Sequence, residues 1–193
     1  MEKVIFLDRD GTINEEVHYL FRREDLRIIP GVPAALRRLK EQGYRLVVVT
    51  NQAGVGRGYY REEDVKDLHL YMNELLQAEG AEIDGFFYCP HHPVYGIGAY
   101  KQVCRCRKPD VGMFEMAERL FDVDKAASWM VGDKETDLAA GRNYGVRTAL
   151  VGTGYGAGVY EEYLHKDGAR PFDLYGATLM DVAEEILRRG RRE

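Results

Sequence analysis

Two aspartates, Asp8 and Asp10, directly follow an apolar run at residues 3–7 of this chain. Residues two apart in an extended chain point the same way, so we expect the two carboxylates side by side. Like charges at this spacing are costly unless a cation or a chemical task accounts for them. A carboxylate that attacks phosphorus, beside a second that moves a proton, would be such a task. The following Gly11 permits a sharp turn that brings backbone N–H groups near a bound anion.

An Asp-x-Asp-Gly sequence also occurs in calcium-binding loops, where further Asp or Asn side chains and a distant Glu complete the site. Here Thr12-Ile13-Asn14 follows instead, and a calcium loop is not preceded by a strand. A turn with solvated carboxylates would explain the pair if it stood alone, but other polar clusters accompany it.

Two more polar clusters follow apolar runs further along the chain. Residues 50–52 are Thr50-Asn51-Gln52, and Gly132-Asp133 is followed four residues later by Asp137. Ligands of doubly wound sheets bind outside the carboxyl ends of the strands, so we expect all these clusters at one edge. Up to four carboxylates would gather there, and oxygen ligands of this kind favour Mg²⁺. Asp137 could alternatively cap the helix in which it lies.

An anionic phosphate ester could enter such an acidic site only if positive side chains lay beside it. Arg107 and Lys108 come shortly before a predicted helix, and Lys134 is the neighbour of Asp133. A lysine is a compact charge for phosphoryl oxygens, and Thr50 offers a hydroxyl and an N–H. Phosphoryl transfer depends mainly on positioning and charge neutralisation, and these residues provide both.

Apolar runs alternate with amphipathic stretches, and this alternation has to position the clusters. The pattern predicts strands at residues 3–7, 46–50, 85–88, 128–131 and 148–151, and helices at residues 30–43, 62–78, 113–121, 137–143 and 179–187. The side chains expected to face inward from the second and third helices are Val65, Leu68, Met72, Leu75, Leu76, Phe114, Ala117, Leu120 and Phe121. Strand–helix alternation of this kind predicts an α/β fold with a doubly wound, mainly parallel sheet.

Length and composition limit the possible classes of protein. The 193 residues suit one domain, residues 1–193, and leave no room for a separate helical cap domain between the motifs. A net charge of −5 argues against nucleic-acid binding. No segment has about 20 consecutive apolar residues, so we expect no membrane-spanning helix. Three cysteines suggest no disulfide framework, and we expect a cytoplasmic location. No exposed apolar stripe is evident, which favours a monomer.

The motifs together resemble those of the haloacid-dehalogenase (HAD) superfamily of phosphotransferases: Asp8-x-Asp10-Gly11-Thr12, Thr50, Lys108 and Gly132-Asp133-x-x-x-Asp137. The resemblance implies a HAD-like, Rossmannoid fold. It implies that Asp8 attacks phosphorus to form an aspartyl phosphate, while Asp10 protonates the leaving oxygen and later accepts a proton from water. Mg²⁺ would be held by Asp8, the backbone carbonyl of Asp10 and Asp133, with Asp137 behind them. Thr50 and Lys108 would hold the transferring phosphoryl group.

A second group of residues has the character of a metal site. Cys89-Pro90-His91-His92 is followed by Cys104-Arg105-Cys106, so all three cysteines fall in one loop. Cys89, His91, Cys104 and Cys106 supply four ligands for a closed tetrahedral Zn²⁺ site, with His92 as the alternative to His91. The alternative to a zinc site is three unrelated thiols with surface histidines. A metal here would also fix the adjacent Arg107 and Lys108 at the active site.

The Cys-Pro-His-His-Pro and Cys-x-Cys-Arg-Lys-Pro segments resemble a narrower family. They are similar to those of the D-glycero-D-manno-heptose-1,7-bisphosphate 7-phosphatases and the related histidinol-phosphate phosphatases. This resemblance implies removal of the 7-phosphate of a heptose bisphosphate in nucleotide-heptose synthesis. The residues it places against the phosphosugar substrate are Arg9, Glu16, Val17, His18, Tyr19, Asn51, Gln52, Ala53, Arg107 and Lys134.

Two alternatives remain open from the sequence. One is histidinol phosphate as the substrate, and the other is a non-catalytic phosphosugar-binding or zinc-stabilised interaction protein. The glycine-rich segment from Gly152 to Gly158 partly matches a dinucleotide-binding fingerprint, but that fingerprint belongs to a first strand–helix unit. We expect a mobile loop near the active-site edge instead.

Overall fold

Six parallel strands form one sheet in the part of the chain that the structure describes. The computed structural model describes residues 1–166 and 168–191. The strands are β1 (Lys3–Leu7), β2 (Tyr44–Asn51), β3 (Gly85–Cys89), β4 (Trp129–Gly132), β5 (Arg147–Val151) and β6 (Leu174–Gly176). Their order is β3-β2-β1-β4-β5-β6, and every neighbouring pair is parallel. The predicted doubly wound, parallel sheet is therefore confirmed.

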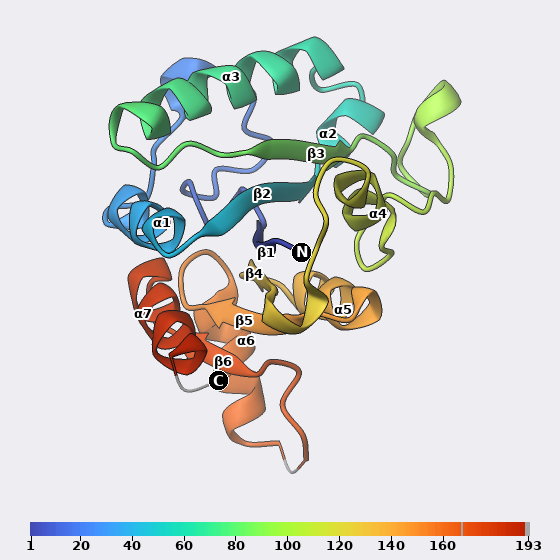
Figure 1. The fold of residues 1–193 in the computed structure, drawn as a ribbon. Helices are drawn as coiled ribbons and strands as arrows, with labels where there is room; N and C mark the ends of the chain where they lie inside the picture. The colour runs from blue at the N-terminus through green and yellow to red at the C-terminus, as the bar shows by residue number, and fades with distance from the viewer. Residues whose placement is uncertain (167, 192–193) are drawn as a thin grey trace.

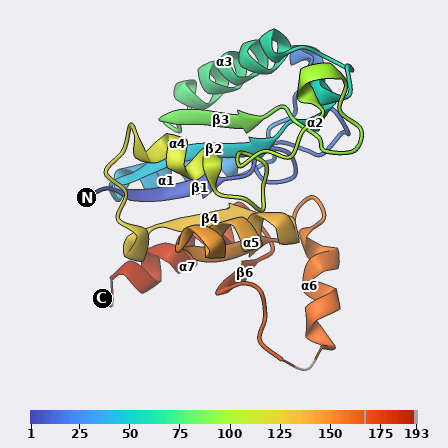
Figure 2. The same cartoon turned by 90° about the vertical axis from the view of Figure 1, so that its right-hand side faces the viewer.

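Helices cover both faces of this sheet. They are α1 (Val32–Glu41), α2 (Ala53–Gly56), α3 (Glu62–Ala78), α4 (Gly112–Glu118), α5 (Glu135–Tyr144), α6 (Gly156–Leu164) and α7 (Leu179–Gly190), with short 3-10 turns η1 (Arg23–Asp25), η2 (Gly98–Tyr100) and η3 (Lys125–Ala127). Helices α1 and α7 lie on one side of the sheet, and α4 and α5 lie on the other (Figure 1). Seen from the side, the strand arrows of β2, β3 and β4 point to the same end of the molecule (Figure 2).

Alternate residues of each central strand enter two different cores. In β1, Ile5 and Leu7 pack with α1, α3 and α7, whereas Val4 and Phe6 pack with α4 and α5. A strand that is buried on both faces needs apolar side chains at every position. This requirement explains why the central strands are visible in the sequence as unbroken apolar runs.

The helices differ from the sequence prediction in several places. Leu120 and Leu75 were both expected to be buried. Helix α4 ends at Glu118, so Leu120 lies beyond it and is 70% exposed. Leu75 of α3 is 40% exposed. The polar residue His69 takes a place in the buried face of α3. Helix α5 is longer than predicted, and α2, α6 and β6 were not predicted.

That residues 1–193 form a single domain remains a prediction. Residues 167 and 192–193 of this range lie outside the described part of the chain. Between β1 and β2 the chain forms only η1 and α1, and α1 packs in the core. Among the helices described, none is both long enough and apolar enough to cross a membrane.

Candidate active site

The ends of β1 and β4 bring Asp8 and Asp133 together. The strand order changes direction between these two neighbouring strands, which is where ligands of such sheets bind. The N–H of Asp8 donates to the carbonyl of Val131 at 2.9 Å, so the strand pairing extends to the aspartate itself. Asp8, Asp133 and Asp137 each place a carboxylate oxygen within 4.8 Å of the others.

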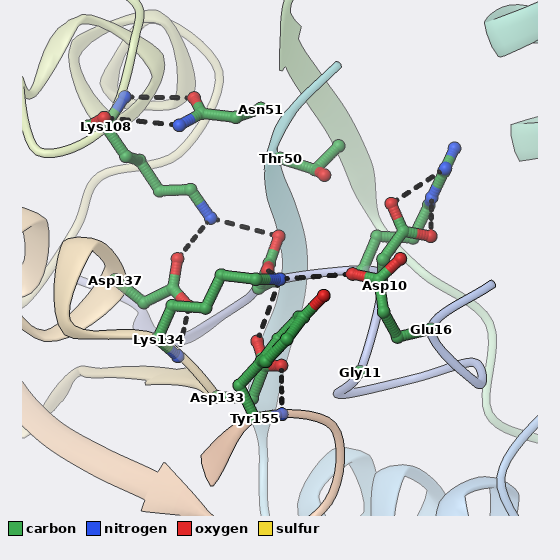
Figure 3. Close-up of polar contacts among 12 residues, drawn as sticks. Asp10, Gly11, Glu16, Thr50, Asn51, Lys108, Asp133, Lys134, Asp137 and Tyr155 are labelled. Atoms are coloured by element: carbon green, nitrogen blue, oxygen red, sulfur yellow. Dashed lines mark hydrogen bonds and ion pairs between the residues drawn. The ribbon is translucent and has the colours of Figure 1, made fainter. Parts of the chain in front are cut away.

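Lys108 lies between two of these carboxylates (Figure 3). Its Nζ is 3.0 Å from Oδ1 of Asp8 and 2.6 Å from Oδ1 of Asp137. The amide of Asn51 fixes the lysine backbone, because its Oδ1 accepts from Lys108 N at 3.0 Å and its Nδ2 donates to Lys108 O at 3.2 Å. Burial opposes the charge of Lys108, but Asp137 and Asp8 outweigh it and raise the pKa of the ammonium group.

Asp8 is ionised although it is buried. Burial alone would raise its pKa, but the positive charges of Lys108 and Lys134 outweigh that effect and lower the pKa below its usual value. Only the ionised carboxylate can act as a nucleophile. Lys108 and Lys134 together therefore favour the ionised form of Asp8.

The negative charge of Asp133 is costly. Its side chain is fully buried, and burial together with repulsion from Asp8 raises its pKa to about 7. Burial and Asp8 also raise the pKa of Asp137. Clustered carboxylate oxygens of this kind are the donor set that a divalent cation stabilises. The three aspartates therefore fit the Mg²⁺ expected from the sequence.

Asp137 has protein partners for both of its oxygens. Oδ2 accepts from the N–H of Lys134 at 3.0 Å at the start of α5, and Oδ1 forms the ion pair with Lys108. The helix cap that the sequence allowed is thus present. Asp137 therefore serves both as a helix cap and as a partner of Lys108 in this structure.

Lys134 closes the other side of the cluster. Its Nζ lies 3.3 Å from Oδ1 of Asp133, 3.4 Å from Oε2 of Glu16 and 3.8 Å from Oδ2 of Asp8 (Figure 3). Burial would lower its pKa, but Asp8 and Asp133 outweigh burial and raise it. Two charged lysines therefore approach Asp8 through different oxygens.

Asp10 is held by three donor side chains. Arg9 donates from Nε to Oδ1 at 3.0 Å and from Nη2 to Oδ2 at 2.9 Å. Asn14 donates to Oδ1 at 3.0 Å, and Gln52 donates to Oδ2 at 3.1 Å. These bonds fix the carboxylate in one orientation beside Asp8.

Arg9 does not lie where the sequence prediction placed it. Its side chain is 0% exposed and does not line the cavity, because the residue between Asp8 and Asp10 points to the opposite side of the chain. Its Nη2 also donates to the carbonyl of Leu20 and its Nη1 lies 3.3 Å from Nε2 of His69. Arg9 therefore acts on Asp10 rather than on a ligand.

A cavity of about 370 Å³ opens above these groups. Its lining comprises Asp8, Asp10, Glu16, His18, Tyr19, Thr50, Asn51, Gln52, Ala53, Tyr60, Arg107, Lys108, Lys134, Thr136 and Asp137. Of the residues expected to contact substrate, Arg9 and Val17 are outside this lining. Tyr60 and Thr136 were not predicted. Thr136 lies inside the Gly132-to-Asp137 motif, whereas nothing in the sequence marks Tyr60, whose hydroxyl donates to Oε1 of Gln52 at 2.8 Å.

The segment that carries His18 and Tyr19 adopts an unusual backbone. Both residues have positive φ angles, 50° and 58°, which residues other than glycine rarely adopt. The N–H of His18 donates to Oε1 of Glu16 at 2.9 Å. Such conformations persist only where the surroundings impose them, and they cluster at ligand sites.

The three cysteines and His91 form a compact cluster. The sulfur atoms lie 3.1 to 3.3 Å apart, and Nδ1 of His91 is 3.4 Å from Sγ of Cys106 and 3.8 Å from Sγ of Cys89. Hydrogen bonding from Cys89 lowers the pKa of Cys106 to about 5, whereas burial and hydrogen bonding with Cys106 raise the pKa values of Cys89 and Cys104, so only the Cys106 thiol is shifted toward the thiolate that binds metals. Nδ1 of His92 instead accepts from the N–H groups of Val94 and Tyr95. The donor set therefore fits zinc with His91 rather than His92.

The glycine-rich segment after β5 reaches the active site. The hydroxyl of Thr153 donates to the carbonyl of Gly11 at 2.6 Å, and the N–H of Tyr155 donates to Oδ2 of Asp133 at 3.0 Å. The segment then continues directly into α6. The expected position at the active-site edge is correct, but the prediction of a mobile loop through Gly158 missed this helix.

Known proteins resemble this chain over nearly its whole length. A family model described as HAD-hydrolase-like matches residues 105–174. The D-glycero-beta-D-manno-heptose-1,7-bisphosphate 7-phosphatase of Haemophilus ducreyi is 42% identical over 187 residues, which cover 96% of this chain and 98% of that protein. The D-glycero-alpha-D-manno-heptose-1,7-bisphosphate 7-phosphatase of Burkholderia mallei is 47% identical over 149 residues, which cover 77% of this chain and 79% of that protein.

A solved structure agrees with these relatives. The D,D-heptose 1,7-bisphosphate phosphatase from B. bronchiseptica, complexed with magnesium and phosphate, is 32% identical to this chain. It superimposes with a TM-score of 0.82 over 97% of this chain and 99% of that one. The resemblance expected from the motifs is confirmed: this chain belongs to the D-glycero-D-manno-heptose-1,7-bisphosphate 7-phosphatase family of HAD-like hydrolases.

Proposed function

We propose that this protein is a Mg²⁺-dependent phosphatase that removes the 7-phosphate of D-glycero-D-manno-heptose 1,7-bisphosphate. The observation that carries the proposal is the pairing of Asp8 with Lys108 at the floor of a cavity that Asp10 also lines. The arrangement combines an ionised nucleophile, a second carboxylate and fixed positive charges, which phosphoryl transfer requires.

In the first half of the reaction, an oxygen of Asp8 attacks phosphorus and the bond from phosphorus to the sugar oxygen breaks. Asp10 gives a proton to that oxygen, so the leaving group departs as an alcohol. Lys108 and the hydroxyl of Thr50 line the same cavity and hold the transferring phosphoryl oxygens.

In the second half, water attacks the phosphorus of the aspartyl phosphate. Asp10 accepts the proton of the water, the bond from phosphorus to Asp8 breaks, and phosphate leaves. The hydrogen bonds from Arg9, Asn14 and Gln52 keep Asp10 in one orientation for both proton transfers.

Two metals complete the proposal. Asp8, Asp133 and the backbone carbonyl of Asp10 would hold Mg²⁺, which supplies charge neutralisation for the phosphoryl group, with Asp137 behind them. Cys89, His91, Cys104 and Cys106 would hold a structural Zn²⁺. Nη1 of Arg107 donates to the carbonyl of His91 at 3.2 Å, so the zinc loop directly supports a cation of the cavity.

The decisive test is Mg²⁺-dependent phosphate release from a matched panel of substrates. The panel contains the α- and β-anomers of heptose 1,7-bisphosphate and histidinol phosphate. We expect a higher kcat/KM for a heptose bisphosphate, and a loss of at least about 10³-fold in Asp8→Asn, which removes the nucleophile. The preferred anomer would identify the nucleotide pathway. Preference for histidinol phosphate, or no release from either bisphosphate, would overturn the proposed substrate.

A further inference from the structure

The loop between β5 and α6 contacts the carboxylate of Asp133 on the side away from Lys134. We propose that Gly11, Gly154 and the N–H of Tyr155 form a clamp that selects which oxygen of Asp133 is presented to Mg²⁺. Gly154 and Tyr155 are then positioning residues, which act on the metal through Asp133. The inference rests on the proposed function for the identity of the metal.

The two oxygens of Asp133 have different surroundings. Oδ1 faces the cluster, 3.3 Å from Nζ of Lys134, whereas Oδ2 accepts from the N–H of Tyr155 at 3.0 Å (Figure 3). The side chain of Asp133 is fully buried. The hydrogen bond from the N–H of Tyr155 therefore occupies Oδ2, and Oδ1 faces Lys134.

Because Gly11 and Gly154 have no side chains, this carboxylate fits between them. Both have positive φ angles, 84° and 58°, which glycine adopts without strain. A Cβ atom on Gly11 would overlap Oδ2 of Asp133 and lie 3.2 Å from Cα of Gly154. A Cβ atom on Gly154 would overlap the same oxygen and lie 2.8 Å from Cα of Gly11. A side chain at either position would thus displace the carboxylate.

A hydrogen bond joins the two sides of the clamp. The hydroxyl of Thr153 donates to the carbonyl of Gly11 at 2.6 Å, so the loop after β5 is tied to the loop after β1. The Asp-x-Asp-Gly motif and the glycine-rich segment, far apart in sequence, hence form one structure around Asp133. Groups that orient a metal ligand commonly change metal affinity by about 10- to 100-fold when they are altered.

The test compares Gly154→Ala with Gly158→Ala in the same segment, because a Cβ atom on Gly158 would meet nothing within 4 Å. Mn²⁺, which also prefers oxygen ligands, is titrated into the substrate-free protein and followed by electron paramagnetic resonance. We expect Gly154→Ala to bind Mn²⁺ at least about 10-fold more weakly than wild type, and Gly158→Ala to bind it equally well. The Mg²⁺ concentration for half-maximal activity should rise in parallel, while KM at saturating Mg²⁺ stays unchanged.

Wild-type Mn²⁺ affinity in folded Gly154→Ala would overturn the inference, as would an equal weakening in Gly158→Ala. If Gly154→Ala does not fold, Thr153→Val decides, since it removes the hydroxyl and adds no bulk. This variant should bind Mn²⁺ at least about threefold more weakly, and unchanged affinity would overturn the inference. Metal binding is measured without substrate. A wild type that binds Mn²⁺ but hydrolyses no bisphosphate would therefore overturn only the proposed function.

Discussion

Lys108 and Asp8 form a buried ion pair in which Nζ lies 3.0 Å from Oδ1. The pKa of Asp8 is lowered because Lys108 and Lys134 together outweigh the effect of burial, and the pKa of Lys108 is raised because Asp137 and Asp8 outweigh the same effect. The charge of each group therefore depends on the other. The charge state of Asp8 is therefore not a property of Asp8 alone.

Lys108→Met should lower both stability and activity. Removing one partner of a buried ion pair costs about 3–5 kcal/mol, and we expect a loss of this order in the free energy of unfolding without divalent metal. Saturating Mg²⁺ should restore part of it, because the ion binds only the folded protein. Phosphate release should fall at least about 100-fold. Urea unfolding with and without Mg²⁺, together with a phosphate assay, checks these effects.

Lys125→Met is the control for this prediction. The side chain of Lys125 is 44% exposed and pairs with Glu118 at 3.1 Å, so the loss of this surface ion pair should change stability by less than about 1 kcal/mol. A similar destabilisation in both variants would contradict the importance assigned to burial at Lys108.

Arg107→Ala should discriminate between substrates with one and two phosphates. Arg107 lines the cavity, and its guanidinium is oriented by the carbonyl of His91. A charged hydrogen bond contributes about 1.5–3 kcal/mol, so kcat/KM for heptose 1,7-bisphosphate should fall about 10- to 100-fold. For heptose 7-phosphate, which lacks the second phosphate, the loss should stay below about threefold. Steady-state kinetics on both substrates measures the ratio.

Arg105→Ala serves as the matched control, because Arg105 is exposed, pairs with Glu115 and lies outside the cavity lining. It should leave both kcat/KM values unchanged. Equal losses on the two substrates in Arg107→Ala would assign Arg107 to general support of the loop instead of recognition of a second phosphate.

The central strands and the positions of the motifs were predictable because both follow local rules. Strands buried on two faces need unbroken apolar runs, and polar residues after such runs must gather at one edge. Helix α6 was not predictable in the same way, since Gly156 and Gly158 lower its helix propensity and only its packing against β5 reveals it. Leu120 has helical spacing but lies after the end of α4, which packing determines.

Within the site, the sequence indicated the right residue types but not always their orientation. Arg9 stands between the two aspartates in the sequence, but its side chain points to the opposite side of the chain. From there it supports Asp10 from the core. Tyr60 lines the cavity because of the way the chain folds around α2, and no sequence motif marks this residue. The clamp on Asp133 depends on contacts between segments about 140 residues apart, such as that from Thr153 to Gly11, which no local pattern contains.

His69 should make the protein less stable as the pH falls below about 6.5. Burial, and then the charge of Arg9, lower the pKa of His69 well below its usual value. Above pH 6.5 neither the folded nor the unfolded state binds this proton, so His69 contributes no pH dependence. Below it the unfolded chain binds a proton that the folded state excludes, and stability falls by about 1.4 kcal/mol per pH unit.

His69→Gln should remove this loss of stability at low pH while keeping a hydrogen-bond acceptor for Arg9. The difference in free energy of unfolding between wild type and His69→Gln, measured from pH 7.5 to 5, should therefore slope only below about pH 6.5. A flat difference for His69→Gln would show that His69 can be protonated in the folded state.

Removal of the proposed Zn²⁺ should act on substrate recognition through Arg107. Cys104 and Cys106 immediately precede this arginine, and the carbonyl of His91 accepts its hydrogen bond, so loss of the metal releases the arginine from both sides. Treatment with 1,10-phenanthroline in excess Mg²⁺, with zinc content followed by mass spectrometry, should lower Tm and kcat/KM for the bisphosphate. In Arg107→Ala the same treatment should lower Tm equally but change kcat/KM much less, because the recognising group is already absent. If zinc-free wild type keeps its full kcat/KM, or if the treatment lowers kcat/KM equally in both proteins, the loop does not act through Arg107.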